Sequence, residues 1–149
     1  MNRLETSPLR IAIVGAGGYS GAELVNILLR HPRAEIVGLF GSSKRDEGPQ
    51  QLLEDIFPRF RGRLKLPVTA AEPGAIAALK PDAVFLATPH EASEALASPL
   101  LKTGACVLDL SAAFRFRDAG VYPVHYGFAH THPDLLATAV YGLPELFRS

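Results

Sequence analysis

The sequence alternates short, apolar, β-branched runs with longer stretches of helical composition, and this alternation limits its possible folds more than any other feature. Such an order is typical of repeated βαβ units, which place parallel strands in one sheet. Because the runs are almost continuously apolar, we expect helices to bury both faces of that sheet. The sequence therefore predicts an α/β fold with a doubly wound, mostly parallel sheet. Strands are expected at 10–14, 35–40, 64–68, 83–87 and 105–110, and helices at 18–31, 50–57, 73–79 and 92–102.

The alternation stops after Leu110. Residues 111–133 hold five aromatic side chains and little periodicity, which indicates an ordered loop. With 149 residues, 48% of them hydrophobic, the chain has enough apolar side chains for one core. We expect residues 1–149 to form one domain, in which residues 111–149 are an ordered, irregular segment that leads into a further α+β domain outside this sequence.

Charge and cysteine content exclude several classes of protein. Fifteen basic residues balance fifteen acidic ones, so no net field favours nucleic acid. No apolar run reaches the roughly 20 residues that span a bilayer, and the polar amino terminus lacks the apolar core of a secretory signal. The single cysteine, Cys106, has no partner for an internal disulfide. The sequence predicts a cytoplasmic protein that binds a small molecule, with no nucleic-acid or membrane partner.

A glycine-rich turn, Gly15 to Gly21, lies between the first predicted strand and the first predicted helix. Gly15 permits a tight turn, a central glycine lets the backbone approach a pyrophosphate, and the helix N-terminus presents free N–H groups to that anion. Gly21 shares the buried face of the helix and allows close packing on the sheet. We predict a Rossmann-like dinucleotide site formed by Gly15, Gly17, Gly18, Tyr19, Ser20 and Gly21.

The spacing of this turn is G-x-x-G-x-x-G, and the strict G-x-G-x-x-G fails because residue 20 is serine. A competing interpretation is therefore a plain strand-to-helix turn. In that case Ser20 and Glu23 would form an S-x-x-E capping box at the start of the helix.

The loop after the second predicted strand indicates which dinucleotide binds. NAD sites usually carry an acidic residue here, about 20 residues past the glycines, to hold the ribose 2′-hydroxyl. This sequence has Ser42, Ser43, Lys44 and Arg45, whose hydroxyls and positive charges suit a 2′-phosphate. The pattern favours NADP(H) over NAD, and the alternative is an exposed loop of solvated charges.

Thr88, Pro89 and His90 follow the fourth predicted strand at the carboxyl edge of the sheet, where open α/β sheets bind ligands. We predict that they contact the cofactor. They serve equally well as the start of the next helix, with Glu91 and Glu94 in a first turn where the helix dipole favours acidic residues.

Ser111 and Arg115 follow the fifth predicted strand at the same edge. Arg115 suits a carboxylate or phosphate ligand through a bidentate pair, and its alternative role is a salt bridge that positions the loop. Cys106 lies in the apolar run 105–110, where cysteine is typically a small buried hydrophobe, so we predict no catalytic residue in this chain. The remaining loop histidines lack the spacing of a metal site and are expected at the surface: His125, His130 and His132.

Five segments together resemble the amino-terminal part of the N-acetyl-γ-glutamyl-phosphate reductase family, which is related to aspartate-semialdehyde dehydrogenases. The resemblance covers nearly the whole chain, and the order and spacing of the segments are specific. The segments are residues 14–24, 87–90, 109–115, 126–128 and 140–146.

The resemblance implies NADPH-dependent reductive dephosphorylation of N-acetyl-γ-glutamyl phosphate to the semialdehyde, in arginine biosynthesis. In this family a cysteine thiolate attacks the acyl phosphate, and hydride transfer to the thioester releases the aldehyde with help from a histidine. The family places that cysteine in an Asn-Pro-Gly-Cys-Tyr type segment, which this chain does not reach before Ser149. We therefore expect these residues to bind NADP(H) without turning over, within a longer homo-oligomeric protein.

The resemblance is incomplete at Ala113, where family members commonly have aspartate. Two other functions stay open. One is a carrier-linked α-aminoadipyl-phosphate reductase of lysine biosynthesis, which shares the scaffold. The other is a non-catalytic NADP-binding module.

Overall fold

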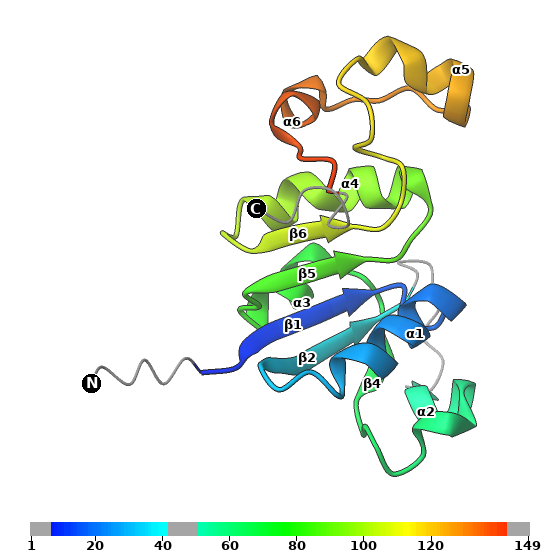
Figure 1. The fold of residues 1–149 in the computed structure, drawn as a ribbon, viewed down its shortest axis with the longest axis vertical. Coiled ribbons are helices and arrows are strands. Elements are labelled where there is room, and N and C mark those ends of the chain that lie inside the picture. Colours follow the sequence, from blue (N-terminus) through cyan, green and yellow to red (C-terminus); the bar gives the residue numbers. More distant parts are fainter. Residues whose placement is uncertain (1–6, 42–50, 143–149) are drawn as a thin grey trace.

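The centre of the molecule is a six-stranded sheet, seen in a computed structural model that describes residues 7–41 and 51–142 (Figure 1). The strand order is β3-β4-β2-β1-β5-β6, and all neighbouring pairs are parallel except β3 with β4. This confirms the predicted α/β, mostly parallel sheet. The strands are β1 (Leu9–Val14), β2 (Ala34–Phe40), β3 (Gln51–Leu52), β4 (Pro67–Thr69), β5 (Ala83–Leu86) and β6 (Cys106–Asp109).

Helices cover both faces of the central strands, because alternate residues of each strand point to opposite sides. On one face, Ile11 and Ile13 of β1 pack in a cluster with Val25 of α1. On the other, Val14 packs in a cluster with Ile76 of α3 and Leu100 of α4. The helices are α1 (Tyr19–Leu28), α2 (Leu53–Ile56), α3 (Pro73–Ala78), α4 (His90–Leu101), α5 (Tyr122–Tyr126) and α6 (Pro133–Thr138), with 3-10 turns at Pro58–Phe60 and Ala119–Val121.

The edge strand β6 departs from the prediction that every strand is buried on both faces. Cys106 was expected in the core, but it is exposed, and so are Leu108 and Leu110. Val107, which points to the opposite face, packs against the cluster that includes α4. The prediction for Cys106 was wrong because an apolar run does not say whether a helix lies over each face of the strand.

The segment after β6 is more regular than the predicted loop. Residues 111–142 contain the 3-10 turn Ala119–Val121 and the short helices α5 and α6, and they extend past the β6 edge of the sheet (Figure 1). Their core is Tyr122, which is fully buried among aromatic rings. Helices of five and six residues span less than two turns. They are too short for a repeating pattern of apolar residues to be recognised in the sequence.

The region between β2 and β4 is also only partly as predicted. The helix expected at 50–57 is the short strand β3 followed by a four-residue helix, α2. The strand expected at 64–68 begins later, as β4 (Pro67–Thr69). Both differences lie at the β3 edge of the sheet, where the strands and helices are shortest.

Candidate functional site

The glycine turn lies at the carboxyl edge of the sheet, between the ends of three strands. The backbone N–H groups of Gly15 and Ala16 both donate to the Phe40 carbonyl at the end of β2, over 2.7 and 3.0 Å. On the other side, the Ala87 N–H donates to the Val14 carbonyl over 2.9 Å. Because β2 and β5 flank β1, the turn occupies the point where the strand order changes direction. Doubly wound sheets bind ligands at this point.

The turn requires glycine at two positions. Gly15 has a φ of +88°, and a Cβ there would lie 2.1 Å from the Ala87 carbonyl oxygen. A Cβ on Gly21 would lie 2.1 Å from the Gly15 carbonyl oxygen. The predicted tight turn at Gly15 is confirmed. At Gly21 the atoms nearest to a Cβ belong to Gly15 and Ala16, so the close approach is to the turn and not, as predicted, to the sheet. A side chain at Gly15 would therefore push the turn away from Ala87, which follows β5.

Helix α1 begins with unpaired donors. Gly18 is its N-cap and supplies no side-chain hydrogen bond. Within the described residues, no acceptor meets the backbone N–H groups of Gly17, Tyr19, Ser20 or Gly21. Such a row of N–H groups at the positive end of a helix dipole binds anions.

The capping-box alternative for this turn is wrong. The Glu23 carboxylate accepts from the Asn26 amide over 3.0 Å and from Arg59 over 3.0 Å, so it does not reach back to the start of the helix. The residues predicted to hold a 2′-phosphate, Ser42, Ser43, Lys44 and Arg45, lie outside the described residues.

His90 is the first residue of α4 and connects that helix to the segment after β6. Its Nδ1 accepts the Ala112 backbone N–H over 3.1 Å, and its ring contacts Tyr126 and Phe128 with centroids 5.0 and 6.2 Å apart. A neutral His90 that accepts at Nδ1 carries its proton on Nε2. Pro89 is the N-cap, and the Thr88 hydroxyl lies 2.8 Å from the Ser93 hydroxyl. These contacts favour the helix-start interpretation of this tripeptide.

Ser111 and Arg115 lie in a turn that is held from several sides. Asp109 accepts the Ser111 backbone N–H and hydroxyl over 3.0 and 2.8 Å. Arg115 donates to the Tyr126 hydroxyl over 3.2 Å, and its guanidinium lies 5.7 Å from the centre of the Tyr141 ring. In the part of the chain that the structure describes, no carboxylate is within ion-pair distance of Arg115. Its charge is therefore available to an anion.

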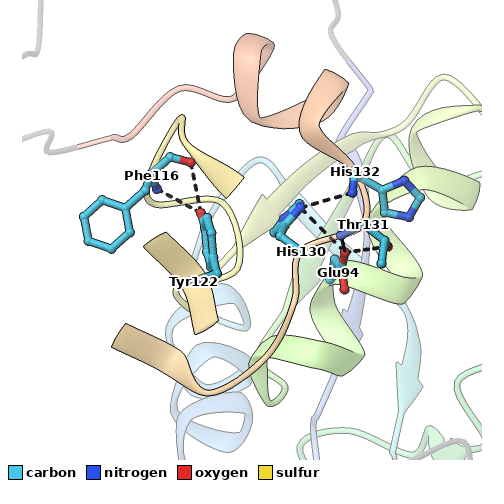
Figure 2. Close-up of polar contacts among 6 residues, drawn as sticks. All are labelled: Glu94, Phe116, Tyr122, His130, Thr131 and His132. Carbon is cyan, nitrogen blue, oxygen red and sulfur yellow. Dashed lines mark hydrogen bonds and ion pairs between the residues drawn. The ribbon is translucent and has the colours of Figure 1, made fainter. Parts of the chain in front are cut away.

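Glu94, His130 and Thr131 form a polar contact that sequence reasoning missed (Figure 2). Glu94 was expected in the first turn of α4 for its charge, but it is 7% exposed and accepts both the backbone N–H and the hydroxyl of Thr131, over 2.5 and 2.7 Å. His130 was expected at the surface, but its side chain is buried, with Nδ1 accepting the His132 N–H over 3.1 Å. One sequence pattern bears on this contact: Glu94 lies four residues after His90, which places the two residues on the same face of the predicted helix.

Burial shifts the pKa values of Glu94 and His130 in opposite directions. Burial by itself raises the pKa of Glu94, but the hydrogen bonds from Thr131 and the nearby His130 and His132 bring this pKa below its usual value. Burial lowers the pKa of His130, against the attraction of the Glu94 charge and the Ala113 backbone. Among the described residues, no hydrogen-bond partner meets His130 Nε2. The pair therefore favours a charged Glu94 beside a neutral His130.

No cluster of three or more potential metal ligands occurs in residues 7–41 and 51–142. None of the helices described is long and apolar enough to cross a bilayer.

The family model described as "Semialdehyde dehydrogenase, NAD binding domain" matches residues 10–149. The chain belongs to this family. Among curated members, N-acetyl-γ-glutamyl-phosphate reductase of Yersinia pestis is 50% identical over 92% of the chain, and that of Bordetella pertussis is 40% identical over 99%. The chain covers only 41% and 40% of these relatives' lengths.

Solved structures of semialdehyde dehydrogenases share the fold. Aspartate semialdehyde dehydrogenase of Candida albicans, solved with NADP, has a TM-score of 0.58 at 22% identity, covering 73% of this chain and 31% of that one. A probable aspartate-semialdehyde dehydrogenase of Pseudomonas aeruginosa has a TM-score of 0.53 at 26% identity, covering 72% and 29%.

Proposed function

We propose that this chain is the NADP(H)-binding part of an N-acetyl-γ-glutamyl-phosphate reductase, which uses NADPH to convert N-acetyl-γ-glutamyl phosphate to N-acetyl-glutamate semialdehyde in arginine biosynthesis. The observation that carries the proposal is the row of free N–H groups at the start of α1, placed at the switch point of the sheet. The reductase names of the 40–50% identical relatives support the substrate.

The residues of the turn fit the diphosphate of a dinucleotide. Gly15 and Gly21 leave no room for a side chain where the backbone closes on itself, and the N–H groups of Gly17, Tyr19, Ser20 and Gly21 have no acceptor among the described residues. We assign the pyrophosphate to this turn and the 2′-phosphate to Ser42, Ser43, Lys44 and Arg45. The bound NADPH supplies a hydride, and Thr88, Pro89 and His90 follow β5 beside the turn that holds it.

Ser111 and Arg115 are the residues we assign to the substrate. Arg115 is exposed, carries its charge without a carboxylate partner in the described residues, and is oriented by the Tyr126 hydroxyl. A guanidinium held in this way suits the phosphate or carboxylate of an acyl phosphate. Its role is to bind and orient the substrate at the same edge of the sheet as the cofactor.

Cys106 does not act as the nucleophile, although it is exposed. It is the first residue of β6, so it lies at the amino edge of the parallel sheet, and the glycine turn lies at the carboxyl edge. The length of β6, at about 3.3 Å per residue, separates the two. We therefore propose that the nucleophilic cysteine of the reductase is outside these 149 residues and that they bind NADPH without turning over.

Calorimetric titration with NADPH and NADH tests the cofactor assignment. NADPH should bind more tightly, and Lys44→Ala with Arg45→Ala should reduce the preference at least tenfold, because a hydrogen bond to a charged group contributes about 1.5–3 kcal/mol. Arg33→Ala with Lys102→Ala, which removes two exposed cations at the amino edge of the sheet, is the matched control and should leave the preference unchanged. An unaltered preference in the Lys44/Arg45 variant rejects the 2′-phosphate site, and failure to bind either dinucleotide rejects the proposed function.

A further inference from the structure

Glu94 is a carboxylate that lies largely out of solvent on α4. Its side chain is 10% exposed, and no lysine or arginine of the described residues lies within ion-pair distance of it. Both donors of Thr131, the backbone N–H and the hydroxyl, bond the same Glu94 oxygen, Oε1. A buried charge is tolerated where hydrogen bonds replace its lost solvation, so this carboxylate and its two donors have to stay together. The contact therefore fixes residue 131 on α4.

The ring of His130, the residue before Thr131, packs against the turn that carries Arg115. It meets the Phe114 ring edge-on, with centroids 5.3 Å apart, and Phe114 immediately precedes Arg115 in the chain. The Tyr122 ring lies 4.8 Å from the same His130 ring, whose side chain is fully buried (Figure 2). A displacement of residues 130–131 would therefore remove the packing of the side chain next to Arg115.

The same face of α4 holds this turn at a second point. His90, one helical turn before Glu94, accepts the Ala112 backbone N–H over 3.1 Å. The Arg115 backbone N–H in turn donates to the Ala112 carbonyl over 3.3 Å. His90 thus fixes the start of the turn directly, and Glu94 acts on its end through residues 130–131. Together the two contacts determine where the Arg115 side chain leaves the backbone.

We propose that Glu94 is a positioning residue of the reductase, which holds residues 130–131 on α4 and thereby keeps the Arg115 guanidinium in the orientation that binds the substrate. The inference rests on the proposed function, because it takes Arg115 as the group that binds the anionic substrate. Glu94 touches neither substrate nor cofactor and acts only through Arg115. Misplacing a binding group by about 1 Å can cost about 10²-fold in rate, so a partial loss of this support should be measurable.

A double-mutant cycle in the full-length reductase polypeptide tests this role. In the reverse reaction, N-acetyl-glutamate semialdehyde, inorganic phosphate and NADP⁺ give the acyl phosphate, NADPH and a proton, and NADPH absorbance reports the rate. Arg115→Ala shows which KM depends on the guanidinium, that for phosphate or that for the semialdehyde with its carboxylate. Glu94→Ala should raise the same KM about tenfold and leave the KM for NADP⁺ within about twofold. Added to Arg115→Ala, it should change that KM by less than about twofold, because the group through which it acts is already absent.

Conservative variants and a matched control separate positioning from a general loss of structure. Glu94→Gln keeps an acceptor for Thr131 and should stay within about twofold of the parent KM. Thr131→Val removes one donor at an exposed residue, so it should preserve the fold and raise the KM by a smaller factor than Glu94→Ala. Glu91→Ala, which removes an exposed acid from the first turn of the same helix, should leave the KM unchanged.

Two results would overturn the positioning role while leaving the proposed function intact. One is a Glu94→Ala enzyme with a lowered melting temperature but the parent KM, since Glu94 would then serve stability alone. The other is an equal rise in KM with and without Arg115, since Glu94 would then act by another route. A parent polypeptide that binds NADP⁺ but does not catalyse the reaction would instead overturn the proposed function, and this inference with it.

Discussion

Alanine at Gly15 tests whether the close approach of the turn to β5 has an energetic cost, and the chain offers a matched control. Gly15 and Gly104 have nearly the same φ, +88° and +87°, so alanine at either position meets the same left-handed strain. That strain is about 1–2 kcal/mol. The surroundings differ, because a Cβ at Gly15 would lie 2.1 Å from the Ala87 carbonyl oxygen, whereas a Cβ at Gly104 would have no atom of the described residues within 4 Å.

We expect Gly104→Ala to lower the free energy of unfolding by about 1–2 kcal/mol. Gly15→Ala should lower it by about 2–5 kcal/mol, because forcing atoms into a packed site adds about 1–3 kcal/mol. Urea unfolding followed by circular dichroism measures both values, and NADPH affinity should fall only in Gly15→Ala. Equal losses of stability in the two variants would refute the reasoning, since the contact with Ala87 would then contribute nothing.

Three further predictions concern the segment after β6. Glu94→Ala should destabilise the protein by about 1.5–3 kcal/mol, because it removes the buried carboxylate that accepts two hydrogen bonds from Thr131. Glu94→Gln, which keeps an acceptor, should destabilise it by clearly less; equal losses in urea unfolding would contradict this. Because burial lowers the pKa of His130, the unfolded chain binds a proton that the folded chain does not, so stability should decrease as the pH falls below about 6.5. His130→Phe should flatten this dependence, and an unchanged slope would exclude His130 as its source. Tyr122→Phe should cost about 1–3 kcal/mol and speed hydrogen exchange at the Phe116 amide, which the hydroxyl accepts over 2.9 Å; unaltered exchange would show that the bond is not formed.

Local patterns in the sequence were sufficient to predict the centre of the fold. The strand 10–14, the glycines at 15 and 21 and the helix from residue 18 stand next to one another in the chain, so spacing alone specifies a βα unit and its turn. The structure places that turn at the switch point, and among the described residues no acceptor meets the N–H groups of Gly17, Tyr19, Ser20 and Gly21. Whether a dinucleotide binds there stays a prediction.

Contacts between distant residues could not be predicted in the same way. Glu94 and Thr131 are 37 residues apart, and neither has a pattern that indicates the other. Cys106 lies in a run that is apolar at every position, which does not reveal that only one face of β6 is covered. Both errors concern which element lies over a residue, and that is decided by topology.

The most direct test of the cofactor site is a titration of the ¹⁵N-labelled chain with NADPH, followed by the backbone amide resonances. The largest shifts should fall on the free N–H groups of Gly17, Tyr19, Ser20 and Gly21, with Gly62 and Gly104 unaffected as internal references. Shifts centred elsewhere, or none at NADPH concentrations that saturate a dinucleotide site, would contradict the assignment of this turn to the pyrophosphate.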